Sequence, residues 1–169
     1  MKQDKEQLIN NEDFIVEALY LSNALMYTLP FVNSLQFPGS SERANKQSLL
    51  HSYISEHGTQ PLGPLIIKTA MKKNNISEST SIVTYIQQTA AFISNVKSPY
   101  KMKKVLIIPN CVHKKISGDL GELIYLYYKI AAQIGFEKMS PSKEIYTFSI
   151  SQNCEDNHTT VEVYIPIQI

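Results

Sequence analysis

Two parts of the chain show the same order of predicted elements, and this recurrence constrains the fold more than any other feature. Each part has a strand, a helix, a glycine, a proline-containing loop and two further strands. The spacing agrees as well, because Gly135 follows Gly58 by 77 residues and Pro141 follows Pro64 by 77 residues. Recurrence of one supersecondary unit predicts two β-α-β-β units that pack together.

The first unit is expected over residues 13–95. Its opening segment from Phe14 to Phe31 is rich in apolar and β-favouring residues. This pattern predicts a strand with a break near Asn23, with a helix as the competing interpretation. Apolar residues at helical spacing predict a helix over 42–56 that ends at Gly58. The rest of the unit is a loop over residues 61–64 and a hairpin. The hairpin strands are expected over 65–70 and 81–89, with an asparagine turn at 74–75.

The second unit is expected over residues 103–169. It opens with a strand over 104–113, in which Pro109 indicates a bulge or an edge position. An amphipathic stripe predicts a helix that begins near Ser117 and ends at Gly135. Two segments with alternating polarity complete the unit, over residues 144–151 and 159–167.

Together the units predict an α+β fold formed by one domain over residues 13–169, after a flexible N-terminus of residues 1–12. The antiparallel sheet is expected to be curved, with two main helices on one face and a ligand groove on the other. Hydrophobic residues make up 43% of the chain and charged residues 18%. A disordered chain has the opposite balance, so the composition supports a packed core.

The composition also excludes several classes of function. The 16 basic and 15 acidic residues give a net charge of +1, without the basic excess of a nucleic-acid-binding domain. The two cysteines and four histidines form no metal-ligand spacing, so no metal or other cofactor is expected. A polar N-terminus and the absence of a long apolar run predict a cytoplasmic protein without membrane contact.

Three segments of the second unit share a further pattern. His113–Leu123 has a basic pair and a glycine before an acidic helix start, and Gly135–Tyr146 combines Gly-Phe, a proline and Glu-x-Tyr. Thr160–Ile167 is a closing strand with a proline between aliphatic residues. In this order and spacing, the segments resemble the GyrI-like domains. The resemblance covers roughly residues 103–167, whereas residues 14–90 match in layout only.

This resemblance implies a fold with a ligand pocket between two units. The family includes effector-binding domains of MerR-type and AraC-type regulators, gyrase-modulating proteins and cyclopropane-opening hydrolases. In its multidrug-sensing members, a buried glutamate of the Glu-x-Tyr strand meets cationic aromatic ligands, and Glu144 stands at that position. The chain departs from the family in having no tryptophan. The 77-residue offset places Ile67 opposite Glu144, so a single acidic anchor is expected.

The residues around Glu144 support a ligand site without the family. Strand alternation places Glu144, Tyr146 and Phe148 on one face. A carboxylate among aromatic rings can pair with a cation, to which the rings add cation–π attraction. The same carboxylate could act as a general acid or base. The alternative is a strand-end glutamate in water.

Other candidate residues lie outside that strand segment. Tyr164, like Tyr146, is a candidate pocket wall, with a core tyrosine as the alternative for each. Tyr20 and Tyr27 are candidates for the opposite side of the pocket. Glu162 is expected to face solvent and His113 to lie at a strand end, with a position at the cleft edge as the alternative for His113. Tyr125 and Tyr128 lie off the main apolar stripe of the second predicted helix. They are expected either at the edge of that helix or in an oligomer contact, such as that of a homodimer.

Three functions fit the sequence. The first is a stand-alone effector-binding module for a small hydrophobic or cationic organic molecule, linked to transcription regulation. No helix-turn-helix precedes the first strand, so direct nucleic-acid binding is not expected. The second is a hydrolase of the cyclopropane-opening type with Glu144 as acid or base, although no clear nucleophile accompanies it. The third is a gyrase-modulating protein-binding factor, for which a marked acidic cluster is missing.

Overall fold

A computed structural model of the 169-residue chain describes residues 15–32, 40–75, 78–118, 132, 140–141, 144–153 and 158–168. This part is mostly antiparallel sheet with one helical element, which agrees with the expected α+β class. The expected flexible N-terminus and most of the second predicted helix lie outside the described residues. The elements are β1 (Ile15–Val32), α2 (Ser40–Glu56), β2 (Pro61–Asn75), β3 (Glu78–Thr89), β4 (Tyr100–Gly118), β5 (Ser140–Pro141), β6 (Glu144–Asn153) and β7 (His158–Gln168).

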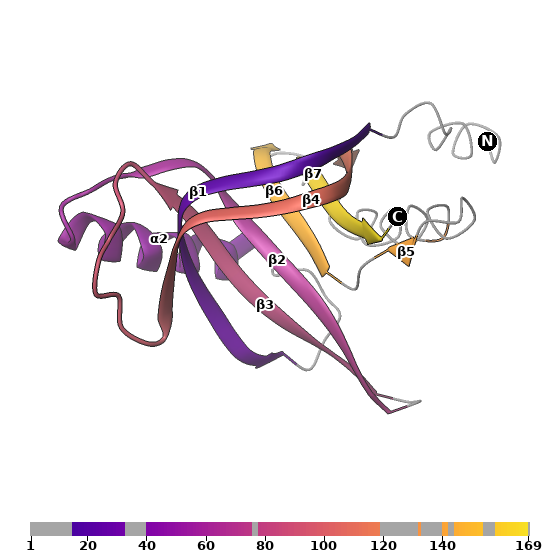
Figure 1. Cartoon of the computed structure of the whole chain (residues 1–169), viewed down its shortest axis with the longest axis horizontal. Coiled ribbons are helices and arrows are strands. Elements are labelled where there is room, and N and C mark those ends of the chain that lie inside the picture. Colours follow the sequence, from indigo (N-terminus) through magenta and orange to yellow (C-terminus); the bar gives the residue numbers. More distant parts are fainter. Residues whose placement is uncertain are drawn as a thin grey trace.

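The main sheet closes on itself. Its strands follow the order β4-β1-β3-β2-β6-β7, and β4 also pairs with β7 (Figure 1). Within the first half the order is β1-β3-β2, and within the second it is β4-β7-β6. The two halves meet where β1 pairs with β4 and β2 with β6. The expected curved antiparallel sheet is therefore closed into a barrel-like sheet, in which these six strands have no unpaired edge.

Two apolar clusters form on opposite faces of this sheet. The outer cluster joins α2 to the first-half strands, and α2 lies beside these strands in Figure 1, away from β7. Its buried members are Leu25, Leu50, Ile54, Leu65, Ile67, Val83, Tyr85 and Ile93. The inner cluster contains no residue of α2. Its buried members are Leu19, Leu21, Ala24, Ile66, Ile86, Cys111 and Tyr146.

The predicted break in β1 is present at Asn23, whose φ is 48°. Two side chains of β3 hold the backbone at this point. The Ser22 amide donates to Gln88 Oε1 at 3.2 Å, and the Thr89 hydroxyl donates to the Asn23 carbonyl at 3.3 Å. The alternation of β1 shifts by one residue here, because Leu19 and Leu21 before Asn23 and Ala24 after it are all inner members, while Leu25 is an outer member.

The helix α2 confirms the predicted helix over 42–56. Leu50 and Ile54 are fully buried, whereas Leu49 on the edge of the same stripe is 41% exposed. The helix ends in two overlapping bonds, from the Thr59 amide to the Ile54 carbonyl and from the Gly58 amide to the Ser55 carbonyl. This Schellman arrangement needs a left-handed residue, and Gly58 supplies it with a φ of 77°.

Three expected boundaries are wrong. Residues 61–64 are not a loop, because β2 already begins at Pro61. The pairing with β3 shifts between Leu62 and Ile66. At this shift the buried Gln87 side-chain amide donates to the Leu62 and Gly63 carbonyls. Ser117 continues β4 rather than opening a helix, because it pairs with Thr160 on β7. His113 lies within β4, not at its end.

The expected bulge at Pro109 is confirmed. Glu17 of β1 pairs with Cys111 of β4, but Leu19 pairs with Ile108. Two residues of β4, Pro109 among them, therefore oppose a single residue of β1. The extra residue keeps Ile108 and Cys111 on the same side of the strand, so both reach the inner cluster.

Candidate functional site

Strand register aligns one residue from each of the six main strands in a row across the inner face. Neighbouring members are directly opposite one another in successive strand pairs, so their side chains share a face. Tyr146 belongs to the buried inner cluster and Tyr164 packs against it, which identifies the face. We call this set the cross-strand row; it consists of Thr28, Thr84, Lys68, Tyr146, Tyr164 and His113.

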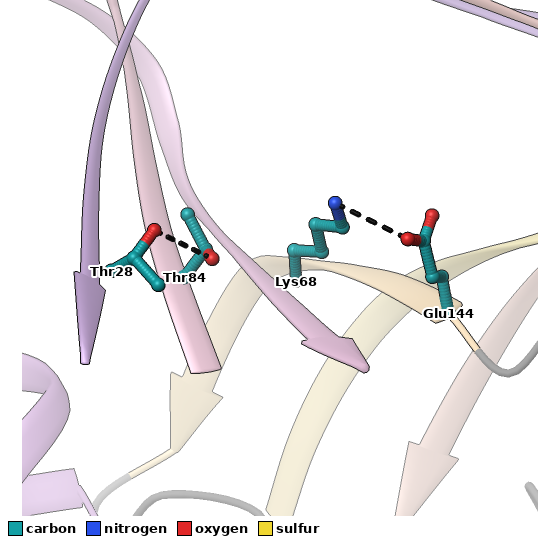
Figure 2. A network of polar contacts seen from close by, with 4 residues as sticks. All are labelled: Thr28, Lys68, Thr84 and Glu144. Carbon is teal, nitrogen blue, oxygen red and sulfur yellow. Dashed lines mark hydrogen bonds and ion pairs between the residues drawn. The ribbon is translucent and has the colours of Figure 1, made fainter. Parts of the chain in front are cut away.

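Glu144 lies beside this row and is paired with Lys68. The Lys68 Nζ atom is 3.4 Å from Glu144 Oε1 and 5.7 Å from the centroid of the Tyr146 ring. Figure 2 shows the two charged side chains extended toward each other from β2 and β6, with the Thr28–Thr84 hydroxyl contact of 3.1 Å nearby. The side chains of Lys68 and Glu144 are 28% and 41% exposed. The predicted acidic anchor therefore has an internal cationic partner.

Aromatic rings occupy the second-half part of the inner face. The Tyr164 ring stacks on the His113 ring with centroids 4.2 Å apart and an interplanar angle of 6°. Its other neighbour is Phe148, at 5.1 Å in a tilted arrangement. Phe148 and Tyr164 are only partly buried, whereas Tyr146 is 3% exposed. The accessible aromatic surface thus comes from Phe148 and Tyr164.

His113 lies between two carboxylates where β1, β4 and β7 meet. Its Nδ1 atom contacts Glu17 Oε1, and its Nε2 atom is 3.5 Å from Glu162 Oε2. Glu162 was expected to face solvent because it alternates with Val161 and Val163. In the structure both valines are buried, and Glu162 instead faces the inner side, two residues before Tyr164 on the same strand face. That expectation is wrong because both faces of β7 are at least partly covered.

The structure brings four of the six predicted ligand-binding residues together and leaves two elsewhere. Glu144, Tyr146, Phe148 and Tyr164 share the inner face. The other two are on β1: Tyr20 is 59% exposed opposite Ile107, and Tyr27 packs against the outer cluster near Tyr100. Both side chains alternate with residues of the inner cluster and so point away from it.

The expected counterpart of Glu144 is also misplaced. Ile67 belongs to the outer cluster with Leu50 and Ile54. Side chains alternate along a strand, so the two neighbours of Ile67 on β2 point to the other face. These neighbours, Ile66 and Lys68, share the face of Glu144. Glu144 is opposite Ala70 in the register. An offset of 77 residues therefore joins positions on opposite faces.

Burial controls the protonation of the inner face. Burial raises the pKa of the Tyr146 phenol well above its ordinary value, with a further contribution from the negative charge of Glu144. Burial also raises the pKa of Tyr164, to which Glu17 and Glu162 add. For the Cys111 thiol, burial is again the main reason that the pKa is raised. These three groups are therefore neutral near pH 7.

The raised pKa of Tyr146 predicts a loss of stability in alkali. The unfolded chain releases the phenol proton near its ordinary pKa of about 10, whereas the folded chain holds it to higher pH. The contribution is therefore fully present below about pH 10 and is lost as pH rises toward the folded pKa. Urea unfolding of the Tyr146→Phe variant should show a smaller decrease in unfolding free energy between about pH 9 and 11 than the wild type. Equal decreases would contradict the raised pKa.

Within the described ranges, no helix is long and apolar enough to cross a membrane. The same residues contain no group of three or more potential ligands that could hold a metal ion.

Solved structures show the same fold. A hydrolase from Listeria innocua is 12% identical with a TM-score of 0.57, over 99% of this chain and 98% of that chain. The EcmrR C-terminal domain is 10% identical with a TM-score of 0.60, over 92% of this chain and 98% of that domain. EcmrR in a complex with DNA is 12% identical with a TM-score of 0.59, over 99% of this chain and 61% of that chain.

The comparisons and the topology together define the class of fold. The chain shares the fold of these structures, which agrees with the resemblance of the second-unit motifs to GyrI-like domains. No family model matches the sequence, and no curated protein matches it either.

Proposed function

We propose that this chain is an effector-type module that binds a small hydrophobic organic molecule on the inner face of its sheet. The observation that carries the proposal is the partial burial of large apolar side chains around the inner cluster. Sites for small molecules combine such apolar and aromatic surface with a few polar groups. The partly buried side chains are Met26, Leu106, Ile108, Phe148 and Tyr164.

The residues of the inner face have distinct roles in this proposal. Phe148 and Tyr164 provide the ring surface on which an aromatic ligand stacks. Glu144 is the polar anchor, since its side chain is partly exposed on the same strand face as Phe148. Tyr146 is almost completely buried, so it supports the site from below rather than forming its surface. Thr28 and Thr84 add a hydroxyl pair on the same row.

The proposed domain extends over residues 13–169, with units at 13–95 and 103–169. A link to transcription regulation is supported by the fold that the chain shares with the C-terminal domain of EcmrR, which is also known in a complex with DNA. In this proposal the domain itself contacts the small molecule and not nucleic acid.

Catalysis receives less support from the described residues. Glu144 is ion-paired with Lys68, so its carboxylate already has a partner within the protein. The free thiol of Cys111 is buried with a raised pKa, which disfavours the nucleophilic thiolate. We therefore propose binding rather than hydrolysis.

A thermal-shift screen tests the proposed site. Lipophilic aromatic compounds, with and without a cationic group, are expected to raise the unfolding midpoint of the wild type, because they bind the folded state alone. Glu144→Gln should weaken the binding of those compounds that use the carboxylate by about threefold to tenfold. Glu56→Gln, at an exposed glutamate on α2, is the matched control and should behave as the wild type.

Two outcomes would overturn this assignment. One is a wild type that no compound stabilises. The other is a Glu144→Gln variant that responds to every compound as the wild type does.

A further inference from the structure

We propose that Lys68 sets the charge preference of the inner face, as an internal cation in the position that a ligand cation would take. The site of this chain then favours uncharged aromatic compounds over cationic ones. This inference rests on the proposed function, because it concerns the same ligand site. It also narrows the expectation from the sequence, which is a small hydrophobic or cationic organic ligand.

The position of the ammonium group carries the argument. A lipophilic cation bound beside Glu144 would use two partners, the carboxylate and the face of an aromatic ring. Lys68 already uses both, with Nζ 3.4 Å from Glu144 Oε1 and 5.7 Å from the Tyr146 ring centroid. Strand pairing holds this arrangement, since Lys68 is directly opposite Tyr146 and diagonal to Glu144.

A ligand cation would find the Glu144 carboxylate already paired, and it would also be repelled by the positive charge of Lys68. To bind Glu144 it must displace the ammonium group from both partners, and the two positive charges then remain close together. An uncharged ring that stacks on Phe148 and Tyr164 requires neither change. Specificity by repulsion of the wrong ligand is common in selective sites.

The other carboxylates of the inner face do not replace Glu144 as a cation anchor. Glu17 contacts His113 Nδ1, and Glu162 lies 3.5 Å from His113 Nε2. Both acids thus lie next to the imidazole at the seam between β1, β4 and β7, whereas Lys68 and Glu144 pair across β2 and β6. Lys68 is 28% exposed, so its side chain can contact a bound compound and act on the choice of ligand directly.

The test uses two probes with the same ring system, N-methylacridinium as the cation and acridine as the uncharged compound, at about pH 8. Fluorescence titration measures the affinity of each probe for the wild-type protein and for three variants. Lys68→Met removes the charge and keeps the length of the side chain, Lys68→Gln removes the charge and keeps a polar end, and Lys68→Arg keeps the charge.

The wild type is expected to bind acridine more tightly than N-methylacridinium. Lys68→Met and Lys68→Gln should each bind N-methylacridinium about tenfold more tightly than the wild type does, because an ion pair and a cation–π contact no longer compete. Their affinity for acridine should stay at the wild-type level, which also shows that the site is intact. Lys68→Arg should keep the wild-type preference.

The outcomes separate the two proposals. If acridine binds and neither uncharged variant gains affinity for N-methylacridinium, the role of Lys68 is overturned and the proposed function stands. If neither probe binds the wild type or any variant, the binding of aromatic compounds on the inner face is overturned, and the role of Lys68 with it.

Discussion

Ile54→Ala is expected to lower the free energy of unfolding by about 3 kcal/mol, within the range measured when large aliphatic side chains are deleted from a protein core. Ile54 is fully buried in the outer cluster, where it faces the first-half strands together with Leu50. Deleting three carbons there removes apolar contact and leaves a cavity, because the neighbouring strands are paired on both sides and relax little.

Leu49→Ala is the matched control for this prediction. Leu49 is on the same helix and belongs to the same predicted apolar stripe, but it is 41% exposed. Its truncation should change the unfolding free energy by less than about 1 kcal/mol. Chemical denaturation monitored by circular dichroism measures both variants. Equal losses would contradict the orientation of α2 on the sheet.

Tyr164→Leu is expected to weaken the binding of an aromatic compound identified by the thermal-shift screen by about tenfold or more. The Tyr164 ring is stacked on His113 but is only partly buried. Part of the ring surface is therefore accessible to a ligand. Replacing the ring by an aliphatic side chain removes stacking that contributes about 0.5–1.5 kcal/mol beyond the buried area, in addition to lost contact area. Roughly 1.4 kcal/mol corresponds to a tenfold change in affinity.

Tyr20→Leu is the matched control, because the same substitution is made at a tyrosine that is 59% exposed and points away from the inner cluster. Isothermal titration calorimetry should give the wild-type affinity for this variant. A loss of affinity in Tyr20→Leu with none in Tyr164→Leu would place the ligand on the other face of β1.

Local patterns predict much of this fold because they depend on few contacts. The apolar periodicity of α2 and the glycine that ends it predict the helix closely, and Asn23 marks the break in β1. Alternation within β6 places Glu144, Tyr146 and Phe148 on one face. Each of these features is determined within one element and its immediate turn.

The rest of the site depends on which strands pair and in what register. Lys68 becomes the partner of Glu144 only through the β2–β6 pairing. Glu162 faces inward because β7 is paired with both β4 and β6 in a closed sheet. Tyr20 and Tyr27 both point away from the inner face although they are an odd number of residues apart, because the break at Asn23 lies between them. Alternation along one strand contains no information on such long-range pairing.

The binding of a ligand on the inner face is tested most directly by nuclear magnetic resonance of the protein with a compound from the screen. Intermolecular nuclear Overhauser effects report which side chains lie within a few ångströms of the ligand. The expected contacts are the Phe148 and Tyr164 rings and the Met26 methyl group, without contacts to Tyr20 or Leu49. Contacts confined to Tyr20, Ile107 or Leu49 would contradict a ligand site on the inner face.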